Sequence, residues 1–478
     1  MSTADDLLHE IALPSSVHLG GGHANGDGAT DRRHYRRGAL AGDLRCTVTS
    51  HRQSVTSWCL WIDDGSDGVG SLMNAADRVR SLRIALLGTR GVPAQYGGFE
   101  TCVEEVGRRL VEYGHRVVVY CRRAEDESVG ANHYQGMRLI YPPALRRRSL
   151  ETLSHTGASV AHLVRHGADV AIMFNSANAP WLLPLRAARI PVATNVDGLE
   201  WRRAKWGNVG QRYYRAAEAL SVRWSDALIA DAQGIADYYR EVFHADTALI
   251  SYGAPIIEVG SDRLADLDLS AAGYHLVVAR FEPENHVSEI VAGYQRSTAR
   301  LPLVVVGSAP YADAYTEKVR ASGDDRVRFL GGVWDQELLN QLFAGSFSYL
   351  HGHSVGGTNP SLLRAMGAGA SAIAFDVRFN REVLGTAGEY FRSPQELALL
   401  LEQAEADPAR MRGKGIQALG RAKAYDWDDV AAKYERLSQR LAAGGAPIHR
   451  PSGRRSGMDV RWRTPTLIQQ SGEQPGGP

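Results

Sequence analysis

Short apolar runs alternate with amphipathic segments of helix length through most of the chain. The runs predict buried strands at 82–87, 116–120, 137–141, 170–174, 191–195, 227–230 and 248–252, and again at 275–279, 303–306, 327–330, 347–350 and 371–375. The segments between them are long enough for helices. This alternation is typical of an α/β fold with a doubly wound parallel sheet, and it occurs here as two consecutive series.

The two series and their flanks predict a division into domains. We expect a disordered or low-complexity extension at 1–80, a first sheet domain at 81–253, a linker at 254–272, a second sheet domain at 273–424, an amphipathic helix at 425–443 and a disordered tail at 444–478. The extension is rich in Gly, Ser, Asp, His and Arg and shows no sustained period. A further hypothesis is that translation begins at Met73, just before the first strand.

The bulk composition excludes several classes of protein. The 478 residues suit two or three domains, and a net charge of +1 does not indicate a nucleic-acid partner. The four cysteines show no metal-binding spacing, and no apolar run approaches the roughly 18 residues of a membrane span. Residues 1–30 lack the apolar segment of a signal peptide. We therefore expect a soluble cytoplasmic protein.

The most informative stretch is the loop and helix at 351–367. A polar loop carrying His353, Ser354, Thr358 and Asn359 follows a predicted strand, and the next helix starts at Pro360. A glycine-rich loop before a helix favours phosphate binding, because free backbone amides and the helix dipole both attract an anion. The alternative is an ordinary strand–helix connection. Asp376, Asn380 and Glu382 follow the next strand and would either line the same pocket or cap a helix.

A second glycine-rich loop, GTRGVPAQYGGFE, follows the first strand. It fits neither the dinucleotide-binding pattern nor the P-loop pattern, which argues against a reductase and against a kinase. Gly97 and Gly98 stand directly before a helix. They would allow close approach of a phosphate or sugar, or else they form a tight turn that requires positive φ.

Basic and aromatic residues mark two further places in the first domain. Arg146, Arg147 and Arg148 precede a helix, where they would contact a phosphate or the inner face of the plasma membrane, or simply form a solvated surface. Arg202 and Trp206 belong to the segment EWRRAKW, whose alternative role is a helix that docks its tryptophans while its arginines reach water.

Four motifs in this order resemble one family. GTRGVPAQYGGFET, VDGLEWRRAKWG, ARFEPEN and GHSVGGTNPSLLRAMGAG are similar to the family-4 retaining glycosyltransferases, and within them to the branch of rhamnosyltransferase-like proteins of bacterial cell-envelope polysaccharide synthesis. The similarity covers about residues 81–440. It implies the GT-B fold, in which two Rossmann-like domains face a cleft. The first domain would bind the acceptor and the second the nucleotide-sugar donor, and the C-terminal helix would pack back on the first domain.

The resemblance also implies roles for single residues. Arg280 would neutralise the departing diphosphate together with the amides at 357–359, without a metal or any other cofactor. The catalytic candidates are Arg280, Asn285, Asp197 and His155, the last two for the acceptor hydroxyl. The donor-binding candidates are Gly97, Gly98, Glu282, His353, Ser354, Gly357, Thr358, Asn359 and Arg364, and the acceptor or membrane candidates are Arg146, Arg147, Arg148, Arg202 and Trp206.

The sequence departs from the wider family at three positions. Gly356 and Arg364 stand where the wider family has a Glu-x7-Glu pair, and Asn285 stands where it has a lysine. The branch itself has glycine at the position of Gly356 and asparagine at the position of Asn285, so only Arg364 departs from the branch as well. The second glutamate normally accepts hydrogen bonds from the ribose hydroxyls, which an arginine cannot do. Arg364 would therefore either reach a phosphate or belong to an altered site.

The resemblance implies sugar transfer from a nucleotide diphosphate sugar to a lipid-linked or polysaccharide acceptor. In this branch the donor is a deoxyhexose nucleotide such as dTDP-rhamnose, with UDP- and GDP-sugars as alternatives. The rival hypothesis is a catalytically silent scaffold of the same fold that binds a nucleotide sugar or a partner enzyme, and Arg364 is the residue that favours it.

Overall fold

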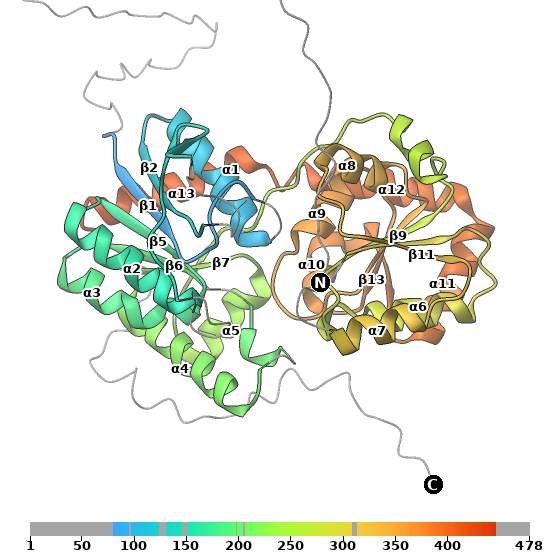
Figure 1. Ribbon diagram of the computed structural model, residues 1–478, viewed down its shortest axis with the longest axis horizontal. Coiled ribbons are helices and arrows are strands. Elements are labelled where there is room, and N and C mark those ends of the chain that lie inside the picture. The colour runs from blue at the N-terminus through green and yellow to red at the C-terminus, as the bar shows by residue number, and fades with distance from the viewer. Residues whose placement is uncertain are drawn as a thin grey trace, which may run out of the picture. The chain divides into compact units, whose positions relative to one another are not determined.

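The computed structural model describes residues 80–94, 97–123, 131–145, 151–196, 198–203, 206–307 and 313–445. Almost all of the predicted extension and tail, residues 1–79 and 446–478, lies outside these ranges. The described residues form two α/β domains, each built around one sheet (Figure 1).

The first domain holds a sheet in the order β3-β4-β2-β1-β5-β6-β7-β8, in which all neighbours are parallel except β3 and β4. Its strands are β1 (Arg83–Leu87), β2 (Arg116–Tyr120), β3 (His133–Tyr134), β4 (Met137–Ile140), β5 (Val170–Phe174), β6 (Val192–Asn195), β7 (Ala227–Ala230) and β8 (Ala248–Leu249). Its helices are α1 (Gly98–Glu112), α2 (Glu151–His166), α3 (Leu182–Ala187), α4 (Asn208–Trp224) and α5 (Gln233–Phe243).

Helices cover both faces of this sheet, as the side chains of β1 show. Ile84 and Leu86 pack in one core cluster with residues of α1, whereas Ala85 and Leu87 pack in another with residues of α2 and α3. Successive side chains of a strand point to opposite faces, so a strand with an apolar residue at every position is buried on both sides.

The second domain holds a fully parallel sheet in the order β11-β10-β9-β12-β13-β14. Its strands are β9 (His275–Val278), β10 (Leu303–Val306), β11 (Val327–Gly331), β12 (Ser348–His351), β13 (Ala372–Phe375) and β14 (Glu389–Phe391). Its helices are α6 (Val287–Arg296), α7 (Asp313–Ala321), α8 (Gln336–Ala344), α9 (Pro360–Gly367), α10 (Arg378–Leu384), α11 (Pro394–Ala406) and α12 (Pro408–Ala422). The fold class predicted from the sequence is confirmed.

The last helix, α13 (Trp427–Ala442), packs against α1 of the first domain. The phenol oxygen of Tyr434 accepts a hydrogen bond of 2.9 Å from the side chain of Asn195, at the end of β6. The backbone N–H of Ala254 donates to the carbonyl of Tyr425 over 2.7 Å. The two segments that connect the domains, one on each side of the second domain, are therefore hydrogen-bonded to each other.

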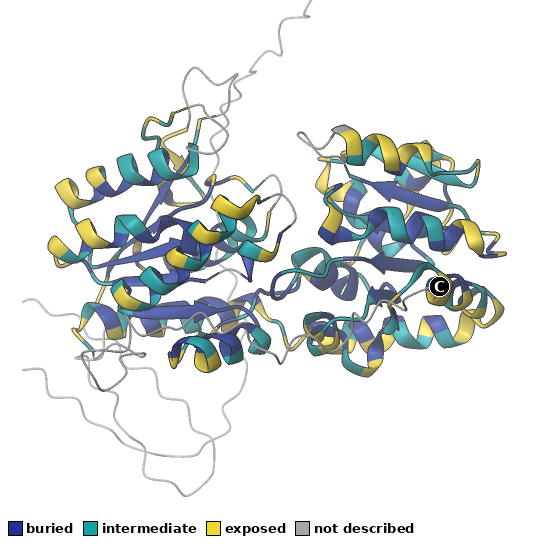
Figure 2. Ribbon diagram, turned by 90° about the horizontal axis from the view of Figure 1, so that it is seen from below, coloured by how far each residue is buried: buried dark blue, intermediate teal, exposed yellow. Residues whose placement is uncertain are grey.

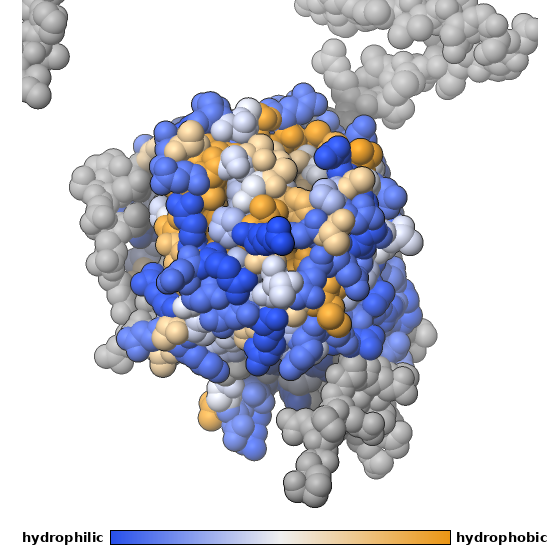
Figure 3. All heavy atoms as spheres, turned by 90° about the vertical axis from the view of Figure 1, so that its right-hand side faces the viewer, coloured by the Kyte–Doolittle hydropathy of each residue, from blue (hydrophilic) through white to orange (hydrophobic). Residues whose placement is uncertain are grey.

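Buried and exposed residues are divided between the strands and the outer sides of the helices. The strands of both sheets are largely buried, whereas most helices expose one side to solvent (Figure 2). Hydrophilic residues cover much of the face seen in Figure 3, with hydrophobic residues gathered in patches between them. Among the described residues, no helix is both long and apolar enough to cross a membrane.

Candidate active site

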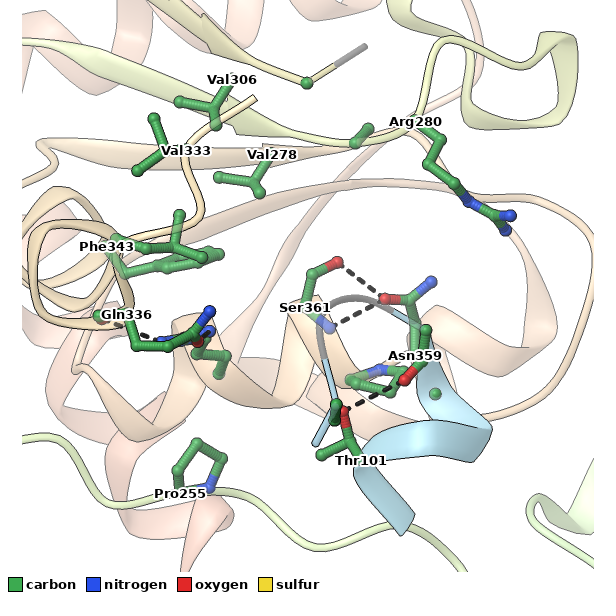
Figure 4. Close-up of a pocket in the computed structure, with 18 of the residues that line it drawn as sticks. Thr101, Pro255, Val278, Arg280, Val306, Val333, Gln336, Phe343, Asn359 and Ser361 are labelled. Atoms are coloured by element: carbon green, nitrogen blue, oxygen red, sulfur yellow. Dashed lines mark hydrogen bonds between the residues drawn. The ribbon is translucent and has the colours of Figure 1, made fainter. Parts of the chain in front are cut away.

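A cavity of about 700 Å³ lies where several strand ends of the second domain meet the start of α1. Arg280 follows β9, Gly307 follows β10 and His353 follows β12, and all three line the cavity. The carboxyl ends of parallel strands gather at one edge of a sheet, which is where open α/β folds bind ligands. Val278, Val306, Val333 and Phe343 add an apolar wall (Figure 4).

The N-terminus of α9 opens onto this cavity. The side-chain oxygen of Asn359 caps the helix, because it accepts hydrogen bonds from the N–H of Ser361 at 3.0 Å and from its hydroxyl at 2.7 Å. Gly98 begins α1 nearby, and a Cβ on it would lie only 3.2 Å from Pro360. The absence of a side chain there keeps the start of α9 accessible, so its dipole can act on an anion.

Arg280 supplies a cation at the same end of the cavity. Its side chain is 45% exposed, and its Nη1 lies 3.6 Å from Glu282 Oε1. Figure 4 shows Arg280 on the same side of the cavity as Asn359, with Gln336 and Phe343 opposite. A half-exposed guanidinium beside a helix N-terminus can bind a phosphate in bidentate fashion.

Asn285 holds the Arg280 loop and the His353 loop together. Its Nδ2 donates to the carbonyl of Arg280 over 2.8 Å, and its Oδ1 lies 2.7 Å from His353 Nδ1. An amide oxygen can only accept, so Nδ1 of His353 carries the proton. Burial, with the charge of Arg203 next in size, holds the pKa of His353 well below its ordinary value. His353 is therefore neutral at physiological pH.

Three predicted donor-binding residues hold the loop and do not line the cavity. The hydroxyl of Thr358 donates to the carbonyl of Asp231 in the first domain over 2.6 Å. The hydroxyl of Ser354 lies 2.9 Å from His286 Nε2, and its backbone N–H donates to Glu284. A Cβ on Gly357 would lie 2.0 Å from the Asp231 carboxylate, so any larger residue there would have to displace that carboxylate.

The structure also places Glu282 behind the cavity wall. Its Oε2 lies 3.6 Å from Nη1 of Arg203, a buried residue of the first domain that also faces Glu284 at 3.8 Å and pairs with Glu200. Glu282 therefore stands between Arg203 and Arg280. This ionic cluster was not predicted from the sequence, because Glu200 and Arg203 are more than 75 positions from Arg280, Glu282 and Glu284.

Arg364 lines the cavity at the end opposite Arg280. Its Nε and Nη2 donate to Asn340 Oδ1 over 2.8 and 2.6 Å, and its Nη1 donates to Gln336 Oε1 over 2.9 Å. Burial lowers its pKa to about 10. The guanidinium therefore stays charged at neutral pH, and it lies 5.8 Å from the ring centre of Phe343.

Of the catalytic candidates in the first domain, His155 lies in the core and not at the cavity. It is fully buried, and its Nε2 donates to the carbonyl of Cys121 over 3.0 Å. Burial lowers its pKa from the ordinary value of 6.5 to about 4. A neutral, fully buried histidine cannot reach an acceptor hydroxyl.

The burial of His155 predicts a pH dependence of stability. Between pH 6.5 and about 4 the unfolded chain binds a proton at this position that the folded chain does not, so the free energy of unfolding should fall as the pH is lowered through this window. Urea unfolding at pH 7 and pH 5 measures the slope. His155→Gln, which can donate the same hydrogen bond, should reduce the slope, while the exposed His133→Gln should not. Equal slopes in all three proteins would contradict this account.

Apart from Gly97 and Gly98, the other predicted site residues of the first domain lie away from the cavity wall or outside the described residues. Arg202 is exposed and lies against the Trp201 ring at 5.1 Å, and Trp206 packs on Tyr214 with ring centres 4.9 Å apart. Asp197, Arg146, Arg147 and Arg148 lie outside the described residues. Gly97 and Gly98 do line the cavity.

The residues after β13 do not line the cavity either. Both carboxylate oxygens of Glu382 accept hydrogen bonds from the start of α5, at 2.7 Å from Gln233 and 3.3 Å from Gly234. Glu382 therefore caps a helix of the first domain. Asp376 pairs with Arg381 and Arg392.

Several wall residues were not predicted. Trp427 of α13, Trp334 before α8, and Gln336 and Asn340 of α8 all line the cavity. Gln336 and Asn340 are four residues apart and so lie on one face of a helix. This spacing was the sequence feature from which they could have been predicted as neighbours. Within the described part of the chain, no group of three His, Cys, Asp or Glu residues could hold a metal ion.

Comparisons with known proteins agree with this architecture. Residues 96–254 match the family Glycosyltransferase Family 4, and residues 274–407 match Glycosyl transferases group 1. The O-antigen chain mannosyltransferase B of Escherichia coli is 24% identical over 180 residues. That match covers 36% of this chain and 46% of the enzyme, so the chain spans about half the length of this curated relative.

Two solved structures show the same fold. Sucrose-phosphate synthase of Thermosynechococcus elongatus superposes with a TM-score of 0.68 at 20% identity, over 76% of this chain and 100% of that one. HepE of Anabaena, in complex with UDP-glucose, superposes with a TM-score of 0.60 at 17% identity, over 75% of this chain and 99% of that one. The match to family 4 is thus followed by a match to group 1, on the GT-B fold of these solved structures, and together the matches indicate an enzyme of the glycosyltransferase type.

Proposed function

We propose that the cavity binds a nucleotide diphosphate sugar and that the chain transfers its sugar with retention of configuration. The observation that carries this proposal is the half-exposed Arg280 beside the N-terminus of α9. These two positive groups would hold the diphosphate. The apolar wall of Val278, Val306 and Val333 suits a nucleobase.

The same groups would act on the transition state. When the bond between sugar and diphosphate breaks, negative charge grows on the departing oxygen and positive charge on the sugar ring. Arg280 and the α9 dipole would stabilise that negative charge without a metal, because they are already oriented before the reaction. Asn285 would keep the Arg280 loop against His353 while the charge develops.

We further propose a lipid-linked glycan or polysaccharide acceptor and a rhamnose-like deoxyhexose donor. The four sequence motifs support the donor class, and the O-antigen mannosyltransferase among the relatives supports the acceptor class. The acceptor would reach the cavity along the first domain, where Arg202 and Trp206 lie. Arg146, Arg147 and Arg148 would bring that domain to the inner face of the plasma membrane.

A thermal-shift panel tests the donor proposal. Full-length protein is melted with UDP-, GDP- and dTDP-sugars and with the free sugars at the same concentrations. Ligand that binds only the folded state raises Tm, by the equivalent of about 2.7 kcal/mol at a hundred times Kd. We expect one nucleotide class to raise Tm and the free sugars to have no effect. A cooperatively melting protein that responds to no nucleotide would overturn the proposal.

A further inference from the structure

Arg364 is a cation whose described partners are all neutral. Four of the five guanidinium N–H groups are engaged, two by Asn340 Oδ1 and two by the side chain and the backbone carbonyl of Gln336. The fifth, on Nη1, has no acceptor among the described residues. A carboxylate normally accompanies a partly buried arginine. The described surroundings of Arg364 therefore lack a negative charge that would balance its guanidinium.

Asn340 adds further donors at the same place. A guanidinium only donates, so the atom of Asn340 that faces Arg364 must be Oδ1, and the amide nitrogen points elsewhere. Within the described chain this nitrogen donates to no acceptor, and Asn340 lines the cavity. This end of the cavity therefore offers N–H groups from both residues and no free carboxylate.

The two carboxylates that line the cavity have other partners. Glu104 accepts hydrogen bonds from the N–H of Ala94 at 2.6 Å and from the hydroxyl of Tyr134 at 2.9 Å. Glu105 pairs with Arg108 at 3.3 Å and also with Arg109. Among the described residues, neither carboxylate forms a hydrogen bond or an ion pair with Arg364.

We propose that Arg364 and Asn340 bind a second anionic group of the donor, a phosphate or a carboxylate, in addition to the diphosphate at Arg280. This inference rests on the proposed transfer from a nucleotide diphosphate sugar and names the substrate class of the same site. It requires a donor with an anionic group that dTDP-rhamnose itself lacks, so such a donor takes the place of the rhamnose-like one proposed from the motifs. Gln336 lies opposite Arg280 and Asn359 in the cavity, and Arg364 is bonded to Gln336, so one ligand can touch both cations (Figure 4). A charge-assisted hydrogen bond is about twice as strong as a neutral one, which favours an anion over a hydroxyl here.

Two sources could supply this anion, and the ligands of the test separate them. A carboxylate on the sugar distinguishes UDP-glucuronate from UDP-glucose. A phosphate on the ribose distinguishes a nucleoside 3′-phosphate 5′-diphosphate from the plain nucleoside 5′-diphosphate. Calorimetric titration of the full chain with each pair gives a ratio of affinities in which the contribution of the shared diphosphate cancels.

In one of the two pairs, we expect the ligand with the additional carboxylate or phosphate to bind about tenfold or more tightly than its partner. This is the ratio that one hydrogen bond to a charged group would give. Arg364→Glu should reverse that ratio, and Arg364→Lys should keep part of it. Arg320→Glu, which changes an exposed arginine of α7 away from the cavity, makes the same change of net charge and should leave the ratio unaltered. Equal melting curves of wild type and variants verify that the fold is intact.

The outcomes separate the two proposals. The second anion site would be overturned if the plain nucleotides bind tightly, neither anionic ligand is preferred, and Arg364→Glu changes nothing. The proposed function would then still stand. Binding of no nucleotide by the wild type would overturn both. If Arg320→Glu lowers the ratio as much as Arg364→Glu, the effect is one of net charge and the site at Arg364 is refuted.

Discussion

Arg280→Ala should lower kcat for sugar transfer by about 100- to 1000-fold, the usual cost of removing one preorganised group that stabilises developing charge. The side chain is half exposed and, among the described residues, makes one ion pair, with Glu282 at 3.6 Å. Glu282 keeps Arg203 as a second partner, so its charge stays compensated in the variant. The fold should therefore survive the change, and the loss should appear in catalysis and in nucleotide binding.

Steady-state kinetics and a melting curve check this prediction together. Arg280→Lys keeps the charge but not the two parallel hydrogen bonds, and it should retain intermediate activity. Arg296→Ala, on the exposed side of α6, is the control and should behave as the wild type. Full activity of Arg280→Ala would show that Arg280 does not act on the diphosphate, and a loss of its cooperative melting would show that the side chain supports the fold.

Trp427→Ala should destabilise the protein by about 3–5 kcal/mol, the range for removing a large aromatic side chain from a core. Trp427 is the first residue of α13 and is only 6% exposed. Its ring lies on the bare backbone of Gly253, where a Cβ would come within 2.4 Å of the indole. The variant leaves a void at the point where α13 meets the chain segment between the domains.

Urea unfolding followed by circular dichroism measures this change. Trp334→Ala is the matched control, because Trp334 lines the same cavity but is 58% exposed. Its replacement should change the free energy of unfolding by no more than about 0.5 kcal/mol. Equal effects of the two substitutions would mean that α13 is not anchored through Trp427.

Much of the fold could be predicted from the sequence because local pattern and tertiary position agree. The strands β2, β5, β7 and β10 have the predicted bounds, and α9 begins at Pro360 with Asn359 as its cap. The short strands β3 and β14 were missed, because two or three residues carry no detectable period. The predicted strand at 248–252 pairs only through Ala248–Leu249.

The candidate site was less predictable, because tertiary packing decides which of its polar side chains reach the cavity and which are buried elsewhere. His155 has the residue type of a catalytic base, but packing puts it in the core. Thr358 has the residue type of a ligand contact, but its hydroxyl is taken by a carbonyl 127 residues away. Arg364 was recognised as unusual from its motif, whereas its partners Gln336 and Asn340 became apparent only when α8 and α9 were seen together.

The return of α13 to the first domain affects the order of folding during synthesis. Domains usually fold as they leave the ribosome, N-terminal first. Here Tyr434, Leu437 and Leu441 belong to the same core cluster as Val103 and Leu110 of α1. That core is incomplete until more than 300 further residues have been translated, so the nascent first domain must expose an apolar groove throughout. Truncation before α13 should leave these apolar residues of α1 permanently exposed.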